Sequence, residues 1–217
     1  MRAALESLLR ARKLDVTLAS CDAPLPPERL APTGKADLDS ALGGGLRRGH
    51  LSEIVGAPSS GRSTLVARLL AAATARGEAT ALVDACDTWD PESAVAHGVR
   101  LERVLWIRDS GDAVRALKAF SLVLQAGSFG LVVFDLADVP VIAIRRFPQT
   151  TWMRTARLLE NTGRDTVALL VGTERIARSV GGATLALETS RATWRGTTSR
   201  ARLFAGVDPM PRVVKAR

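Results

Sequence analysis

One short segment constrains this sequence more than any other: Gly56-Ala57-Pro58-Ser59-Ser60-Gly61-Arg62-Ser63-Thr64. It follows an apolar run, precedes a helix-length segment, and matches the phosphate-binding pattern G-x-x-x-x-G-K-[S/T] at every fixed position except Arg62. Glycines permit backbone angles that other residues resist, so consecutive N–H groups can point at a phosphate at the positive end of a helix. The alternative is a glycine-rich turn that only joins a strand to a helix. We expect a P-loop that binds a nucleotide through Gly56, Ser59, Ser60, Gly61, Arg62, Ser63 and Thr64.

Arg62 stands where the pattern requires a lysine. A lysine ammonium is a compact charge that reaches between the terminal phosphates, whereas an arginine guanidinium is larger, planar and forked. Arg62 can still bind phosphate oxygens, but in a different position from that of a lysine. The sequence therefore predicts weak binding of ATP and Mg²⁺ and poor support for phosphoryl transfer.

A second acidic element follows the P-loop. Leu131–Asp135 is an apolar run that ends in a carboxylate. In P-loop proteins such an aspartate supports the Mg²⁺ shell, and the serine or threonine of the loop binds the ion. The sequence therefore predicts that Ser63 and Asp135 hold Mg²⁺ when a nucleotide is bound.

Short apolar runs alternate with helix-length segments along the core, which predicts an α/β fold with a mostly parallel sheet covered on both faces. After Gly182 the helices stop, and consecutive strands predict an antiparallel C-terminal extension. The expected helices are Ser63–Ala75, Pro91–His97, Ala113–Gln125 and Thr151–Asn161. The expected strands are His50–Val55, Ala79–Asp84, Val104–Ile107, Gly130–Phe134, Thr166–Val171, Thr184–Thr193, Ala201–Phe204 and Arg212–Lys215.

The N-terminal segment is predicted to be separate from this core. Residues Ala3–Lys13 form an amphipathic pattern with Leu5, Leu8 and Leu9 on one side, and a proline-rich stretch follows. We therefore divide the chain into an N-terminal helix and linker, residues 1–29, and a core, residues 30–217. The helix packs either on its own core or on a partner, and we favour the partner.

Charge is unevenly distributed along the chain. From Arg145 onward, 14 basic residues accompany five acidic ones, whereas the rest of the sequence is nearly neutral. Such asymmetry indicates a polyanion or an acidic protein surface as partner. The alternative is an arginine-rich coding bias on a solvated face, because the chain has only four lysines.

No feature of the sequence points to a membrane or to secretion. No apolar run reaches the roughly 18 to 20 residues that would span a bilayer. Met1–Lys13 lacks the apolar block of a secretory signal, and Cys21 and Cys86 are too few and too far apart for a disulfide framework. We expect a cytoplasmic protein without a membrane partner.

Several segments in the expected order resemble the bacterial RecA recombinase family over residues 30–217. Thr33–Leu46 is similar to the family's segment before the P-loop, T-G-x-x-x-L-D-x-x-L-G-G-G-L, and Glu53-Ile54 continues it. Val83–Asp87, with Asp90-Pro91 and Gly98-Val99 after it, resembles D-A-E-x-x-x-D-P…G-V. Pro211–Arg217 resembles the V-V-K-x-K strand near the end of the family's core. The resemblance implies a RecA-like P-loop core.

The departures from the family concern catalysis. Cys86 stands where the family has the glutamate that activates water, and Thr173 stands where it has a glutamine that senses the γ-phosphate. A thiol is a poor general base, so the resemblance implies little or no ATP hydrolysis. The two DNA-binding loops would lie around residues 139–148 and 174–182, and both are short. The resemblance implies weak nucleic-acid contacts through Arg145, Arg146, Arg175 and Arg178.

A truncated RecA-like chain with a degenerate site is similar to the ImuA family of accessory proteins in translesion mutagenesis. This likeness implies a DNA-damage (SOS) role through binding to RecA, to ImuB-like and DnaE-type polymerase subunits, and to single-stranded DNA. In the RecA family an N-terminal helix and the lysines of the V-V-K-x-K strand join neighbouring protomers. The corresponding interface residues here are Leu5, Leu8, Leu9, Lys215 and Arg217.

Two other functions remain open on the sequence alone. The intact glycine frame, Ser63 and Asp135 would also suit an active DNA-dependent ATPase or recombinase of the RecA family. The third hypothesis is a P-loop protein with another cellular role, such as a switch.

Overall fold

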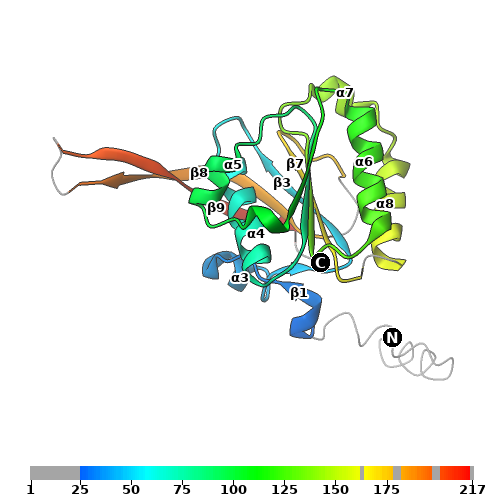
Figure 1. Ribbon diagram of the computed structural model, residues 1–217, viewed down its shortest axis with the longest axis horizontal. Coiled ribbons are helices and arrows are strands. Elements are labelled where there is room, and N and C mark those ends of the chain that lie inside the picture. Colours follow the sequence, from blue (N-terminus) through cyan, green and yellow to red (C-terminus); the bar gives the residue numbers. More distant parts are fainter. Residues whose placement is uncertain (1–24, 162–163, 178–181, 197–200, 216–217) are drawn as a thin grey trace, which may run out of the picture.

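A computed structural model describes residues 25–161, 164–177, 182–196 and 201–215 (Figure 1). In this part of the chain seven strands form one sheet in the order β5-β4-β6-β7-β3-β8-β9, and β1 and β2 form a separate antiparallel pair. The strands are β1 (Leu30–Ala31), β2 (Leu46–Arg47), β3 (His50–Gly56), β4 (Thr80–Asp84), β5 (Val104–Arg108), β6 (Leu131–Asp135), β7 (Val167–Gly172), β8 (Thr184–Arg195) and β9 (Leu203–Lys215). The α-helices are α3 (Ala36–Ala41), α4 (Arg62–Ala75), α5 (Pro91–Ala96), α6 (Ala113–Ala126), α7 (Val141–Arg145) and α8 (Gln149–Asn161), and the 3₁₀ turns are Pro27–Arg29 and Leu101–Arg103.

The central strands are parallel and buried on both faces. Strand β3 pairs in parallel with β7 and β8, and β6 pairs in parallel with β4 and β7. In β6 the side chains of Leu131 and Val133 enter one hydrophobic core, and those of Val132 and Phe134 enter the other. Strands apolar on both faces are typical of parallel sheets covered by helices. The predicted α/β fold with a mostly parallel sheet is confirmed.

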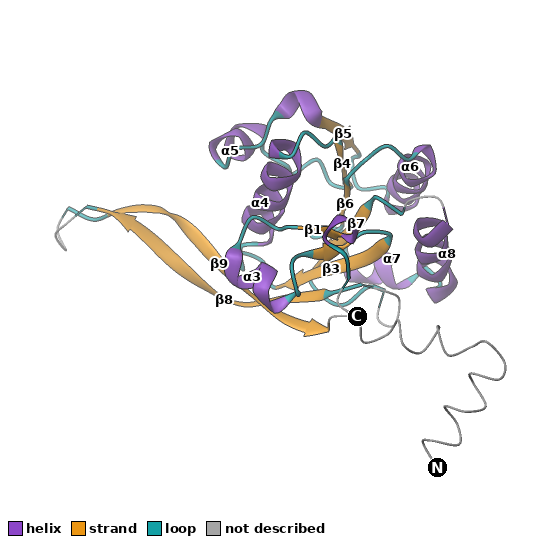
Figure 2. Cartoon of the chain, turned by 90° about the horizontal axis from the view of Figure 1, so that it is seen from below, coloured by secondary structure: helices purple, strands orange, loops and turns teal. Residues whose placement is uncertain are grey.

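Two helical layers cover the sheet (Figure 2). Helices α3, α4 and α5 lie over one face, and α6 and α8 lie over the other. Helix α6 shows how the sequence specifies this packing. The Asp112 carboxylate caps its N-terminus by accepting hydrogen bonds from the Val114 and Arg115 N–H groups, and Gly127 ends it with a φ of 66°. Its buried side chains recur at helical spacing and include Ala116, Phe120 and Val123.

The C-terminal strands differ from the prediction. Ala201–Phe204 overlaps the start of β9 and Arg212–Lys215 forms its end, so the prediction of two separate strands there was wrong. Gly206, Pro209 and Pro211 interrupt the apolar pattern, but β9 is the last strand of the sheet, where proline removes no ladder hydrogen bond on the open side. Strand β8 is parallel to β3, and only β9 runs antiparallel, pairing with β8 through several register shifts.

Two helices of the structure had no counterpart in the prediction. Helix α3 begins just after Thr33, whose N–H and hydroxyl both donate to Asp39 Oδ1 at 2.7 Å. Helix α7 lies within the segment expected to be the first DNA-binding loop. The predicted helix Ala3–Lys13, with Leu5, Leu8 and Leu9, lies outside the described residues. Within the described ranges, no helix combines the length and apolar character needed to cross a bilayer.

Candidate nucleotide-binding site

The P-loop joins β3 to α4 at the carboxyl end of the parallel strands. Glycine is required at both ends of the loop. A Cβ on Gly56 would collide with Ser60 Oγ and lie 2.9 Å from Leu187 Cβ. Gly61 has a φ of 93°, and a Cβ there would lie 2.9 Å from the Cβ of Pro209 in β9. The loop therefore has the backbone path that the glycine pattern predicts, and β9 packs against it.

Two polar groups in the P-loop are buried without a partner. Arg62 is only 8% exposed, and its Nη1 has no hydrogen-bond partner; the same holds for Ser60 Oγ. Unsatisfied buried donors are costly, and here they gather at the N-terminus of α4, where helical N–H groups also lack partners. No acidic side chain occupies the first turn of α4. An anion such as a phosphate would satisfy these groups, so the residues present fit a nucleotide phosphate.

Asp135 lies at the end of β6, and its carboxylate accepts a hydrogen bond from the Ala137 N–H at 2.9 Å. Burial raises the pKa of Asp135 to about 6, and the neighbouring carboxylates of Asp84 and Asp138 act in the same direction. The Ala137 N–H and the Arg62 charge oppose this rise. A raised pKa marks a carboxylate that lacks a sufficient counter-charge. A divalent cation would supply that charge, as the predicted Mg²⁺ role requires.

The other predicted positions lie at the same edge of the sheet. The strand register places Asp84 beside Asp135 and brings Gly172, which precedes Thr173, beside Val55 of β3. Ser63 is exposed in the first turn of α4 and Thr64 is half-buried. The structure thus brings together the P-loop, Asp135, Cys86 and Thr173, although they are far apart in the sequence.

Cys86 is half-buried beside several carboxylates. Burial, together with the charges of Asp138, Asp84, Asp135 and Asp109, raises the pKa of its thiol, so the thiol stays protonated. Asp84 and Asp87, the aspartates nearest to Cys86 in the sequence, are both already hydrogen-bonded. The Asp84 carboxylate accepts hydrogen bonds from the Cys86 and Trp89 N–H groups, and Asp87 forms two hydrogen bonds with Arg108 at the sheet edge.

A cavity of about 330 Å³ opens beside the first turn of α4. None of its lining residues outside the P-loop was predicted from the sequence to be a ligand. The available signal was the Asp90-Pro91 pair, which starts α5 beside the cavity. The lining residues are Ser63, Thr64, Ala67, Thr88, Trp89, Asp90, Ser93, Ala94 and His97.

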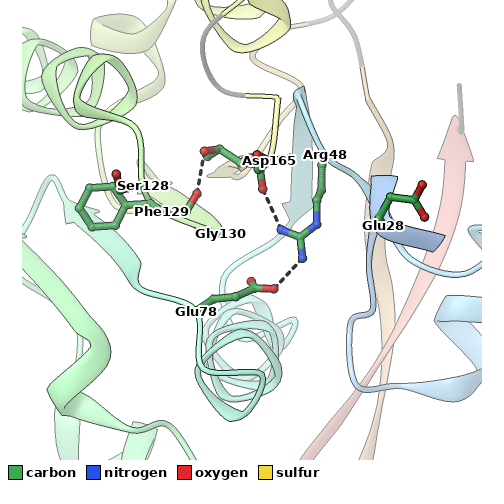
Figure 3. Close-up of a pocket in the computed structure, with 8 residues that line it drawn as sticks. Glu28, Arg48, Glu78, Ser128, Phe129, Gly130 and Asp165 are labelled. Atoms are coloured by element: carbon green, nitrogen blue, oxygen red, sulfur yellow. Dashed lines mark hydrogen bonds and ion pairs between the residues drawn. The ribbon is translucent and has the colours of Figure 1, made fainter. Parts of the chain in front are cut away.

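A larger cavity of about 570 Å³ lies at the opposite end of the sheet, where the strands begin (Figure 3). Arg48 in its wall is already paired: its Nη2 donates to Glu78 Oε1 at 2.6 Å, and its Nη1 donates to the backbone carbonyl of Asp165 at 2.8 Å (Figure 3). Ligands of open α/β sheets bind at the carboxyl ends of the strands, so this cavity is not the candidate site.

The predicted nucleic-acid residues lie on two adjoining segments. Arg145, at the end of α7, forms two hydrogen bonds with Glu174, at 2.9 Å and 2.8 Å. Arg175 lies 3.8 Å from the Glu53 carboxylate, and Arg146 is exposed. Arg178 lies outside the described residues. The carboxylates of Glu174 and Glu53 therefore offset part of the positive charge that the sequence predicts here.

Glu53 is a structural residue that sequence analysis did not recognise. It is buried in β3, and its Oε1 accepts hydrogen bonds from the Ile176 and Ala177 N–H groups at 2.8 Å and 2.5 Å. Glu53 thereby fixes the segment that follows Thr173. A charged residue inside an apolar strand was the signal, because such residues are rarely buried without partners.

The predicted interface residues are only partly described. The Lys215 backbone ends β9 and pairs with Thr184, while Arg217, Leu5, Leu8 and Leu9 lie outside the described residues.

Comparisons with known proteins find similarity to RecA proteins. Residues 27–177 match the family described as the RecA N-terminal domain. The protein RecA of Clavibacter michiganensis subsp. michiganensis is 40% identical over 111 residues, which are 50% of this chain and 30% of that protein. RecA of Kineococcus radiotolerans is 37% identical over 112 residues, 51% of this chain and 32% of that protein. RecA of Streptomyces avermitilis is 38% identical over 114 residues, 52% of this chain and 30% of that protein. The matched stretch therefore spans about a third of these relatives' length.

Proposed function

Because this chain belongs to the family of the RecA N-terminal domain, which its residues 27–177 match, we propose that it is an ImuA-like accessory protein of DNA-damage tolerance. It acts by binding other proteins, with single-stranded DNA as a further ligand, and its nucleotide site does not turn ATP over. The observation that carries this proposal is the half-buried thiol of Cys86, at the position where the recombinases that the chain resembles have a water-activating glutamate.

Loss of the general base supports a binding role. A fold alone does not confer the activity of its relatives, so the side chains at the site decide. Asp84 and Asp87 both lie within two residues of Cys86, but the Asp84 carboxylate accepts hydrogen bonds from backbone N–H groups and the Asp87 carboxylate accepts them from Arg108. Neither carboxylate is available to take a proton from water.

Nucleotide binding without turnover is compatible with the same site. The N–H groups at the start of α4, the Arg62 guanidinium and Ser60 would hold the phosphates, and Ser63 and Asp135 would hold Mg²⁺. The cavity beside Trp89 and Asp90 would accept the base. Bound ATP would supply the negative charge that the buried Arg62 lacks. ATP therefore acts here as a ligand that stabilises the P-loop.

The partners follow from the resemblance and from charge. We propose RecA, an ImuB-like subunit and a DnaE-type polymerase as protein partners. The excess of basic residues from Arg145 onward suits an acidic protein surface or the phosphates of single-stranded DNA.

An active DNA-dependent ATPase is the second candidate function. The observation in its favour is the preserved phosphate cradle, with Gly56, Gly61 and Asp135 all in position. It would need a base that replaces Cys86.

Affinity purification from DNA-damaged cells, combined with phosphate release in the presence of single-stranded DNA, tests the proposal. We expect RecA or polymerase subunits to be recovered with the chain, and phosphate release at the buffer background. DNA-stimulated turnover that Asp135→Ala abolishes, without recovery of those proteins, would establish the ATPase instead.

A further inference from the structure

The β8–β9 hairpin extends beyond the body of the protein (Figure 1). Residues 190–196 and 201–205 are all exposed. We call these residues the distal hairpin. The inner half is different, because Pro209 is buried against Gly61 and Asp208 accepts hydrogen bonds from Lys35 and Arg68. The hairpin is thus anchored at the P-loop and unsupported further out.

The distal hairpin exposes large apolar side chains. Trp194 and Phe204 form a cross-strand pair with ring centroids 5.7 Å apart and an interplanar angle of 78°. They are 51% and 60% exposed, and the adjacent Leu203 is 71% exposed. A two-stranded hairpin alone is at best marginally stable in water, and contiguous exposed apolar surface marks interaction sites. A bound partner would bury these side chains and stabilise the hairpin.

The positive charge of the distal hairpin indicates which kind of partner surface it would bind. Its residues, 190–196 and 201–205, include three arginines and no acidic residue. The first acidic residue that follows, Asp208, is already bound to Lys35 and Arg68. A partner surface that complements this segment therefore carries negative charge around an apolar region. The arginines are Arg191, Arg195 and Arg202.

We propose that the distal hairpin docks a partner protein whose surface has an acidic rim around an apolar pocket. Tryptophan and arginine are the residues that dominate binding energy at protein interfaces. Single-stranded nucleic acid fits less well. Bases stack on open aromatic faces, whereas Trp194 and Phe204 pack edge to face, and Leu203, which is more exposed than either of them, is aliphatic.

Direct binding measurements test this inference, and the choice of probes rests on the proposed function. The probes are purified RecA, ImuB-like subunit and DnaE-type polymerase of the same organism, with an oligo-dT strand as the nucleic-acid arm. Each is titrated with the wild-type chain, Trp194→Ala/Phe204→Ala and Arg195→Glu/Arg202→Glu at low and high salt. Leu122→Ala/Arg157→Glu is the matched control, because both residues are exposed on helices outside the hairpin. Thermal unfolding of every variant shows that the core is intact.

We expect one of the three proteins to bind the wild-type chain, and the aromatic double variant to weaken that binding by roughly tenfold or more. The charge-reversal variant weakens it mainly at low salt, and the control variant has no effect. Equal binding by wild type and aromatic variant overturns the inference but leaves the proposed function standing. If none of the proteins binds the wild-type chain, both fall. Binding of oligo-dT alone that depends on Trp194 assigns the hairpin to nucleic acid and overturns the inference.

Discussion

Arg145 and Glu174 form a bidentate ion pair that joins the end of α7 to the segment after β7, with N–O distances of 2.9 Å and 2.8 Å. These two segments correspond to the loops expected to contact nucleic acid. The hydrogen bonds that Arg145 donates to Glu174 raise the pKa of Arg145, whose charge is partly offset by this carboxylate. Any phosphate that binds Arg145 must compete with Glu174.

Glu174→Gln is therefore expected to strengthen binding of single-stranded DNA. Loss of the competing carboxylate frees Arg145 for one more phosphate contact, so the plot of log affinity against log salt steepens by about 1. Neutralising Arg145, Arg146, Arg175 and Arg178 together should flatten the same plot. Fluorescence anisotropy with a labelled oligonucleotide measures both. Affinity that neither change alters would show that DNA is bound elsewhere or not at all.

Restoring the family's residues at the nucleotide site should recover only part of the hydrolysis. Loss of a general base lowers the rate on the order of 10²- to 10⁴-fold, so Arg62→Lys/Cys86→Glu is expected to raise phosphate release above a wild-type background close to zero. Recovery stays partial because Thr173 remains. Asp135→Ala in the restored chain is the control that should remove the signal. Wild-type turnover equal to that of an ordinary recombinase would contradict this prediction.

The raised pKa of Asp135 has a defined effect on stability. A carboxyl group with a higher pKa in the folded state binds protons more tightly there, so its contribution falls as pH rises from about 4 to above 6. The loss is on the order of 2 kcal/mol, allowing for the solvent that reaches the group. Asp135→Asn removes this titration and should make the chain more stable than wild type at pH 7.5 but not at pH 4. Thermal unfolding at both values measures the difference, and a constant difference across this range would be the contrary result.

Gly61→Ala separates backbone strain from packing against β9. Gly61 has a φ of 93° and Gly77 one of 85°, but only at Gly61 does an added Cβ meet a neighbour, Pro209 at 2.9 Å. Gly77→Ala therefore reports the conformational effect alone, on the order of 1 kcal/mol. We expect Gly61→Ala to destabilise the chain by about 1–3 kcal/mol more, because overpacking adds to strain. Chemical denaturation of both variants measures this, and equal destabilisation would mean that the loop shifts away from β9 without cost.

Deletion of residues 1–13 tests the N-terminal interface. If Leu5, Leu8 and Leu9 pack on a partner, the truncated chain should lose RecA binding while its core unfolds at nearly the same temperature. A lower unfolding temperature would instead assign the helix to the chain's own core. Retention of RecA binding by a stable truncated chain would move the interface to the strand that carries Lys215.

The sequence predicted the backbone path of the P-loop and the buried strands better than the surfaces around them. The P-loop followed from the positions of two glycines, and the buried strands from uninterrupted apolar runs, because both signals are local. The carboxylate at the end of β6 was found in the same way. The pairing of Arg145 with Glu174 and the burial of Glu53 beside Ile176 were not predictable, since each depends on the distance between segments far apart in the chain.

In strand β9 a local signal in the sequence was misleading. Pro209 and Pro211 predict the end of a strand when only their neighbours in the sequence are considered. They are compatible with one continuous strand because β9 lies at the edge of the sheet. The helices α3 and α7 are too short for periodicity to reveal, with six and five residues.

The length of β9 sets the distance between the P-loop and the exposed aromatic pair of the distal hairpin. From Pro209, which touches the P-loop, to Phe204 the strand advances about 17 Å at the usual rise per residue. A protein bound at Phe204 would therefore contact a part of the strand separate from the part that touches a nucleotide site at Gly61. The two sites are separate, so a protein on the distal hairpin and a nucleotide in the P-loop could be bound by the chain at the same time.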